Sequence, residues 1–359
     1  MAIGTATRLL GTLCAAAVLA ACGGSPDRTT PGEDGVTPVV FVGPAAATPS
    51  TLNLQSNLFV EGGYAAEHGL KATLQTAPGP QALAALQSGQ NDFVLTNQAT
   101  VFSAVNSGAK FKIIAGYGMT FPTAIVTRKD ITAVGQLAGK TVAVSSLGDV
   151  PQIYTNAYLS GSGLVDPASV KYSGAGNYAN AMAYLTGGKA DAAWVLVANL
   201  PTVLKNPDLH VLVTPEEFAR FAPSAGTVVV VTEEFANTHR DLVQKVVDMV
   251  VGGSRKLYED ENGYVELVRK VLPNVYSDGE AHEQYQRLRP ALAVNGGMDS
   301  AVLKSSYGLW LKYTAPDGGK SVKLVDATTA FDTSFAATSV RKLGLVRGVM
   351  DSGDLLGTS

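Results

Sequence analysis

The sequence predicts an α/β protein of two similar lobes joined by two crossing strands. Short apolar runs alternate with helical patterns along most of the chain, which is typical of mostly parallel sheets covered by helices. One seven-residue phrase occurs twice, each time between an alanine-rich helical stretch and an apolar run. Two runs rich in β-branched residues, 123–128 and 226–232, flank a complete α/β segment. These runs are expected to carry the chain from one lobe to the other and back.

Residues 1–21 are predicted to be a signal peptide. Arg8 is the only charged side chain among the first 25 residues. The apolar stretch from Leu9 to Ala21 is about half as long as a membrane-spanning helix requires. A short apolar stretch behind a positive residue is typical of a secretory signal.

The run Leu-Ala-Ala-Cys at 19–22 resembles the bacterial lipobox, which implies that Cys22 carries a diacylglyceryl anchor. The alternative is an ordinary signal peptide that ends beside a chance cysteine. Residues 22–37 offer almost no apolar side chain to bury, so they are predicted to be a flexible tether. We therefore expect the body to stand at the extracytoplasmic face of a membrane, held to the lipid bilayer through Cys22.

Composition excludes several classes of function. The only other cysteine, Cys14, lies within the predicted signal peptide, so the mature body has no disulfide, thiolate metal site or cysteine nucleophile. A net charge of −3 without long runs of one sign argues against nucleic-acid partners. With 46% hydrophobic residues, the chain can bury a core in each of two lobes. We expect a monomer without a cofactor or a metal.

The first lobe is predicted to begin with alternating strands and helices. Val39 to Gly43 is a short apolar run and is predicted to be a buried strand. Pro80 suits the first turn of a helix, and Gly89 stops that helix. Thr238 is expected to cap the first helix of a helical C-terminal tail. The predicted strands and helices before the first crossing run are 39–43, 51–68, 70–75, 81–87 and 92–96.

The repeated phrase is Leu-x-x-Gly-x-x-Asp, at 86–92 and again at 185–191. It either marks two lobes of similar fold or is a chance match between two glycine helix stops. The flanking pattern favours two lobes. The predicted boundaries are 38–122 together with 226–350 for lobe I, and 123–225 for the inserted lobe II. A cleft between such lobes is a common place for a ligand.

The run Leu137-Ala-Gly-Lys-Thr-Val-Ala-Val, the repeated phrase and the pair Gly69-Leu70 together resemble the periplasmic-binding-protein-like lipoproteins for sulfonate, nitrate, taurine and thiamine-pyrimidine precursors. The resemblance covers residues 38–235 and implies the type II periplasmic-binding-protein fold, a small-molecule ligand and an ABC permease as partners. Many relatives carry Trp-x-x-x-Pro after the second phrase, whereas a longer apolar run separates Trp194 from Pro201 here. Trp194 is therefore placed either in the pocket or in the core.

Candidate ligand contacts are small, polar and aromatic residues where predicted strands end at the cleft. Helix N-termini offer free N–H groups, so Ser145 to Gly148 suits a polar ligand, unless these residues only cap a helix. Amide side chains both donate and accept, and aromatic rings can sandwich a flat solute. The candidate ligand-binding residues are Gly43, Thr96, Asn97, Gln98, Tyr117, Phe121, Ser145, Ser146, Gly148, Asn177, Tyr178 and Trp194.

Catalytic patterns are weak. The run Gly174 to Ala179 imitates a dinucleotide fingerprint, but the nearest acid, Asp191, comes too early, so the run is either a ligand loop or a plain turn. The chain has no Gly-x-Ser-x-Gly elbow and no Walker A sequence, and its four histidines lack metal-ligand spacing. The eukaryotic pyrimidine synthases that share the fold carry a cysteine-rich motif, which this body lacks. We expect no enzymatic activity and no catalytic residue.

The expected function is capture of a small solute by an extracytoplasmic lipoprotein of an ABC importer. No lysine or arginine falls at a predicted cleft position except Arg128, which is expected at the hinge. This favours a small heteroaromatic, pyrimidine-like solute, with sulfonate or nitrate second. Two alternatives stay open: a ligand sensor for a membrane receptor, and a surface-anchored hydrolase that uses an unrecognised pair of acids.

Overall fold

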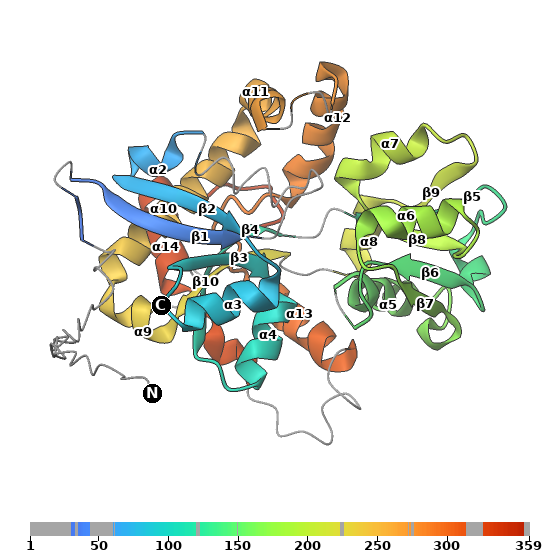
Figure 1. Cartoon of the computed structure of the whole chain (residues 1–359), viewed down its shortest axis with the longest axis horizontal. Helices are drawn as coiled ribbons and strands as arrows, with labels where there is room; N and C mark the ends of the chain where they lie inside the picture. Colours follow the sequence, from blue (N-terminus) through green and yellow to red (C-terminus); the bar gives the residue numbers. More distant parts are fainter. Residues whose placement is uncertain are drawn as a thin grey trace, which may run out of the picture.

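The computed structural model describes residues 30–32, 35–43, 60, 62–119, 123–148, 150–222, 226–271, 273, 276–313 and 326–354. These residues form two α/β lobes that lie side by side (Figure 1). The predicted helix over 51–68 is described mainly at its end, where α2 covers Tyr64–Glu67. The predicted signal peptide, Cys22 and most of the tether lie outside the described residues.

Each lobe is built on a five-stranded sheet, and the two sheets share one strand order. The first sheet has the order β2-β1-β3-β10-β4, from β1 (Thr37–Gly43), β2 (Leu70–Thr76), β3 (Phe93–Asn97), β4 (Phe111–Gly118) and β10 (Thr227–Thr232). The second has the order β7-β6-β8-β5-β9, from β5 (Thr123–Arg128), β6 (Thr141–Val144), β7 (Lys171–Gly174), β8 (Ala192–Leu196) and β9 (Leu209–Val213).

Two strands carry the chain between the lobes. The chain leaves β4 of the first sheet for β5 of the second, and later leaves β9 of the second sheet for β10 of the first. Both β5 and β10 are antiparallel to their neighbours, whereas β1 and β6 pair in parallel with the strands on either side. The predicted α/β fold of two lobes with two crossing strands is confirmed.

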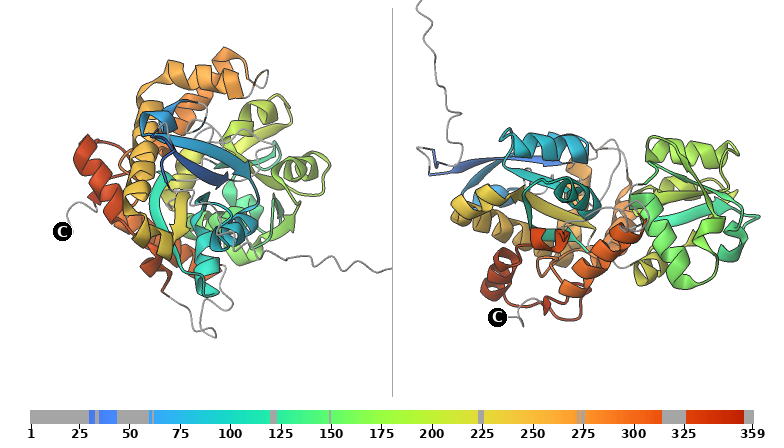
Figure 2. Two further views of the ribbon diagram at one scale, coloured as in Figure 1. Left: turned by 60° about the vertical axis from the view of Figure 1, so that its left-hand side comes forward. Right: turned by 90° about the horizontal axis from the view of Figure 1, so that it is seen from below.

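Helices pack against both sheets (Figure 2). Within the described ranges, no helix combines the length and the apolar character needed to cross a membrane. Thr238 ends α9, and His239 precedes α10, so the predicted cap at Thr238 is wrong. The helices of eight or more residues are α3 (Gly79–Gln87), α4 (Gln98–Asn106), α5 (Val150–Ser162), α6 (Tyr178–Thr186), α10 (Arg240–Glu259), α11 (Glu261–Val271), α12 (Asp278–Leu288), α13 (Ser300–Tyr313) and α14 (Ser334–Leu343). The shorter ones, besides α2, are α7 (Leu200–Leu204), α8 (Pro215–Phe221) and α9 (Glu233–Thr238).

The C-terminal third of the chain contacts both lobes. The helix α10 buries its apolar face in the core of the first lobe, while α11 and α12 contribute side chains to an apolar cluster that also holds residues of β5, α6 and α7. Glu280 of α12 forms an ion pair with Lys205 at the end of α7, with a Nζ–Oε1 distance of 3.2 Å. The helices α11 and α12 therefore pack against β5, α6 and α7 of the second lobe.

The repeated phrase forms the same structure in both lobes. In each copy a buried leucine ends the helix and a glycine adopts a positive φ, +71° at Gly89 and +73° at Gly188. The Oδ2 atom of Asp92 accepts a hydrogen bond of 2.7 Å from the backbone N–H of Val40 in β1. The Oδ2 atom of Asp191 accepts one of 2.9 Å from Thr141 in β6. Each aspartate therefore ties the strand that follows it to the neighbouring parallel strand.

We predict that Asp92→Ala lowers the free energy of unfolding by about 2 kcal/mol, because it removes a buried carboxylate and leaves the backbone N–H of Val40 without its acceptor. Asp191→Ala is expected to cost less, since the Asp191 side chain is 25% exposed. Urea unfolding of the ligand-free protein measures both changes. The control Glu266→Ala alters an exposed acid of α11 and should change stability by less than about 0.5 kcal/mol. A loss at Asp92 no larger than at Glu266 would contradict this role.

A buried carboxylate fastens the C-terminal segment to the first lobe. Asp351 is fully buried, and its Oδ2 accepts hydrogen bonds from the backbone N–H groups of Asn295 (2.6 Å) and Gly297 (2.9 Å). The segment that holds these two residues joins β4, because Gly116 donates its N–H to the carbonyl of Gly296 at 2.7 Å. Burial raises the pKa of Asp351 to about 6, against opposing hydrogen bonds from backbone N–H groups.

Because the pKa of Asp351 is raised, the free energy of unfolding is expected to fall as the pH rises. The folded state binds this proton more tightly than the unfolded chain, so the stabilisation is complete below about pH 4. It is lost as the pH rises to about 6, by about 3 kcal/mol for a shift of this size. Urea unfolding between pH 4 and pH 7 should show this slope, and Asp351→Asn should remove it. An unchanged slope in the variant would contradict the assignment, and Asp241→Asn serves as the exposed control.

Candidate functional site

The carboxyl ends of the parallel strands in both sheets face the space between the lobes. The crossing strands begin at the same edges: Thr123 of β5 pairs with Leu196 at the end of β8, and Thr227 of β10 pairs with Asn97 at the end of β3. A groove of about 610 Å³ lies along α3 and α4, where the lobe II residues Leu147 and Gly148 line it together with residues of the segment 107–111, which leads into β4. Segments from both lobes therefore line one concave surface.

In lobe I the strand β3 delivers two amide side chains to this edge. Asn97 caps α4, because its Oδ1 accepts hydrogen bonds from the Thr100 N–H (2.9 Å) and hydroxyl (3.0 Å). Gln98 is only 1% exposed, and neither its amide oxygen nor its amide nitrogen has a hydrogen-bond partner among the described residues. Because buried amides are almost always paired, Gln98 is the polar group in this wall that most clearly needs a partner.

The other described lobe I candidates lie at or near the carboxyl ends of their strands. Thr96 and Tyr117 are buried at the ends of β3 and β4, and Gly43 ends β1. Burial raises the pKa of Tyr117 well above its usual range, while the nearby Thr227 hydroxyl opposes the shift. Tyr117 is therefore neutral and can serve as a hydroxyl donor or acceptor. Phe121 lies outside the described residues.

In lobe II the candidates from 145 to 148 form the turn that leads into α5. Ser145 is buried, and its carbonyl accepts a hydrogen bond of 2.8 Å from the Gly176 N–H. Gly148 has φ +73° and donates its N–H to Oε1 of Gln152 at 2.8 Å. Ser146 and Leu147 are both exposed, and the exposed fraction of Leu147 is 60%. The turn therefore presents an apolar side chain, which the sequence analysis did not single out.

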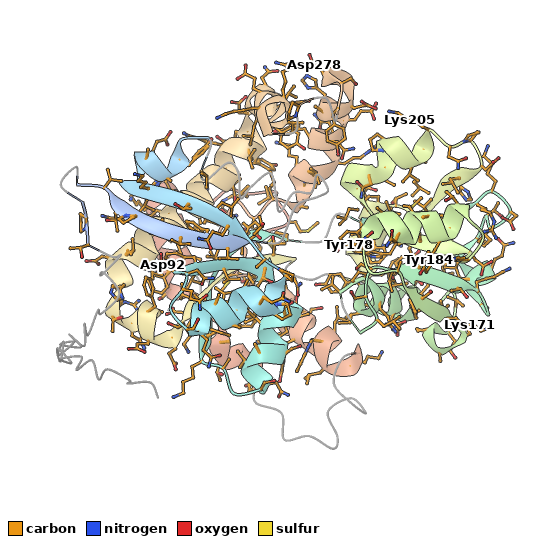
Figure 3. All side chains as sticks on the ribbon, viewed as in Figure 1. Asp92, Lys171, Tyr178, Tyr184, Lys205 and Asp278 are labelled. Atoms are coloured by element: carbon orange, nitrogen blue, oxygen red, sulfur yellow. The ribbon has the colours of Figure 1, made fainter. Side chains whose placement is uncertain are left out.

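Two aromatic candidates of lobe II lie against each other. The rings of Tyr178 and Trp194 are 5.5 Å apart at an interplanar angle of 30°. Trp194 is fully buried within the core cluster that covers one face of the second sheet, so it lies in the core. Tyr178 is partly exposed at the edge of lobe II that faces lobe I (Figure 3). Asn177 caps α6 by accepting the Asn180 N–H at 2.8 Å.

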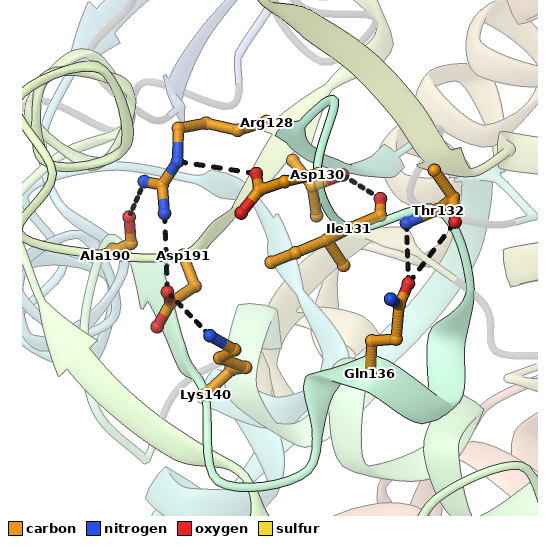
Figure 4. Close-up of polar contacts among 9 residues, drawn as sticks. Arg128, Asp130, Ile131, Thr132, Gln136, Lys140, Ala190 and Asp191 are labelled. Carbon is orange, nitrogen blue, oxygen red and sulfur yellow. Dashed lines mark hydrogen bonds and ion pairs between the residues drawn. The ribbon is translucent and has the colours of Figure 1, made fainter.

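Arg128 does not lie at the hinge, and that expectation was wrong. It ends β5, whereas the edge of the sheet near lobe I is at Thr123, where β5 begins. Its guanidinium donates to the carbonyl of Ala190 (3.1 Å) and pairs with Asp191 (3.5 Å) and Asp130 (3.7 Å) (Figure 4). In the sequence, the segments at the strand ends, 44–51, 96–100, 145–149, 174–178 and 196–199, contain no lysine or arginine. These strand ends therefore offer a solute amide, hydroxyl and aromatic groups but no cationic side chain, and Asp149 is the one acid in their sequence.

We predict opposite stability effects for the two amides. Gln98→Leu should raise the free energy of unfolding of the ligand-free protein by about 1 kcal/mol, because it removes an unpaired buried amide. The same variant should lose about tenfold or more in solute affinity if the amide meets the solute. Asn97→Ala should lower stability by about 1 kcal/mol, because it removes a helix cap. Urea unfolding and titration calorimetry measure the two properties, and Gln98→Leu with full affinity would contradict the assignment.

Comparisons with known proteins agree on the fold. The family model described as NMT1/THI5 like matches residues 59–262. A periplasmic sulfonate-binding protein from Methylobacillus flagellatus KT is similar in structure, with a TM-score of 0.68 and 18% identity, covering 86% of this chain and 95% of its own.

Two further structures extend the comparison. The alkanesulfonate-binding protein of Xanthomonas axonopodis pv. citri, bound to MOPS, has a TM-score of 0.64 and 16% identity, covering 82% of this chain and 98% of its own. A Candida albicans protein described as having the generic periplasmic binding protein fold has a TM-score of 0.59 and 15% identity, covering 89% and 98%. No curated protein matches the sequence.

Proposed function

Because the chain belongs to the NMT1/THI5-like family, we propose that it is an extracytoplasmic solute-binding protein of an ABC importer. The observation that carries the proposal is the buried Gln98 amide, which follows the carboxyl end of β3 and has no hydrogen-bond partner among the described residues. A buried donor and acceptor without a protein partner are suited to a solute that offers both. The lobes close on this solute, and the closed form docks on the permease.

The solute is a small, uncharged, flat compound of the pyrimidine type. Amide side chains pair with the edge of such a ring, and Tyr178 at the facing edge of lobe II offers a ring for stacking. Sulfonate or nitrate is the second candidate, supported by the sulfonate-binding proteins of similar fold. The missing lysine and arginine at the strand ends argue against it, because a bound anion then relies on backbone and hydroxyl donors alone.

The protein is a lipoprotein, tethered to the membrane as a monomer. Cys22 carries the diacylglyceryl group, and residues 23–36 hold the body away from the bilayer. The same body could instead present its closed form to a membrane receptor as a ligand sensor. A receptor that responds to the solute in cells without the permease would favour that second function.

A thermal-shift screen tests the proposed function. We expect cytosine or a related pyrimidine to raise the melting temperature in a saturable way, and taurine, ethanesulfonate and nitrate to raise it less. Calorimetry should give one solute per chain, and chromatography should recover the solute unchanged. Chemical conversion of the solute would favour an enzyme, and a response to sulfonates alone would overturn the pyrimidine assignment.

A further inference from the structure

The turn before α5 carries the most exposed large apolar side chain of those described in this chain. Leu147 is 60% exposed, although it stands at the carboxyl end of β6, beside the space between the lobes. Its side chain lies over Gly174 at the end of β7, where an added Cβ would meet Leu147 Cγ at 3.3 Å. Because Gly174 has no side chain, Leu147 can pack directly on the end of β7. Most of the leucine side chain nevertheless stays exposed.

The groove of lobe I beside Leu147 is lined by apolar side chains together with polar ones, such as Thr100 and Ser103. It runs between α3 and α4, and small side chains form much of its wall, including Ala84, Ala99 and Ala104. Leu147 already lines the mouth of this groove together with these helices. Small residues on two neighbouring helices leave a furrow into which a single branched side chain from a facing surface can pack.

Other contacts between the lobes fix the direction in which they can approach. Ala99 of α4 packs against the core cluster of lobe II, and α13 packs on α5, where Lys312 donates to Ser160 at 3.3 Å. Ala99 also lines the groove, so we expect lobe closure about this contact to carry Leu147 further into the groove. Burying the exposed part of a leucine would favour the closed arrangement about tenfold.

We propose that Leu147 is a closure latch, which packs into the groove between α3 and α4 when the lobes close. The proposal rests on the proposed function, because it assigns the apolar contact that stabilises the solute-bound form. A solute can favour closure only through contacts that exist in the closed form. Leu147 adds a contact of this kind that is independent of the solute, so it sets how often the empty protein closes.

Disulfide trapping tests the latch in the full chain with Cys14→Ser and Cys22→Ser. In this background we combine Leu147→Cys with Ala84→Cys and follow disulfide formation under mild oxidation without solute. The matched control combines Leu164→Cys with Ala84→Cys, because Leu164 is 59% exposed on the same lobe but follows the far end of α5. We expect the first pair to cross-link at least about tenfold faster than the control, and cytosine to accelerate it further.

Equal cross-linking rates for the two pairs would overturn the latch. If the protein binds a solute but the two cysteine pairs cross-link at equal rates, the proposed function stands and only the latch is contradicted. Rapid cross-linking of the first pair, with no solute bound by the protein, would keep the latch and contradict the proposed function. Ala84, Leu147 and Leu164 are all exposed, so circular dichroism should show an unchanged fold for each cysteine pair.

Discussion

The hydrogen bond between a carboxylate and the neighbouring strand is the constraint from which the architecture follows. Asp92 holds β3 to β1, and Asp191 holds β8 to β6, in the same position of two sheets with the same strand order. This bond fixes where the parallel strands begin, and hence where their carboxyl ends lie. Since two crossing strands join the sheets, the carboxyl ends of both meet across one gap. Ligands of open α/β sheets bind at such edges, because helix N-termini and loop side chains converge there.

The wall of this gap has a chemistry that differs from a salt-bridged anion site. Among the described residues its polar groups are amides and hydroxyls, and Arg128, the one cation expected nearby, is held by Asp191 and Asp130 at the opposite end of β5. Gln98 keeps an unpaired buried amide, which lowers the stability of the empty protein. A solute that pairs with it recovers this free energy on binding. A substitution that stabilises the empty protein at Gln98 is therefore expected to weaken solute binding.

The sequence predicted the parts of this structure that local patterns determine. The strand runs, the glycine stops at 89 and 188 and the two β-branched crossings appear where periodicity and composition placed them. It could not predict which partners the polar side chains choose. Asn97 and Asn177 cap helices, and Arg128 turns to Asp191, because each choice depends on residues brought near by folding. The contact of α12 with lobe II was also missed, since an amphipathic helix shows that it packs but not against what.

The central claim is that one solute is gripped between two lobes, which move together when it binds. Small-angle X-ray scattering of the protein, with and without a saturating pyrimidine, tests this most directly. The account predicts a smaller radius of gyration in the bound state and a scattering curve that shifts in a single transition as solute is added. A saturable binding curve with an unchanged radius of gyration would contradict it, because the solute would then occupy one lobe without closing the gap.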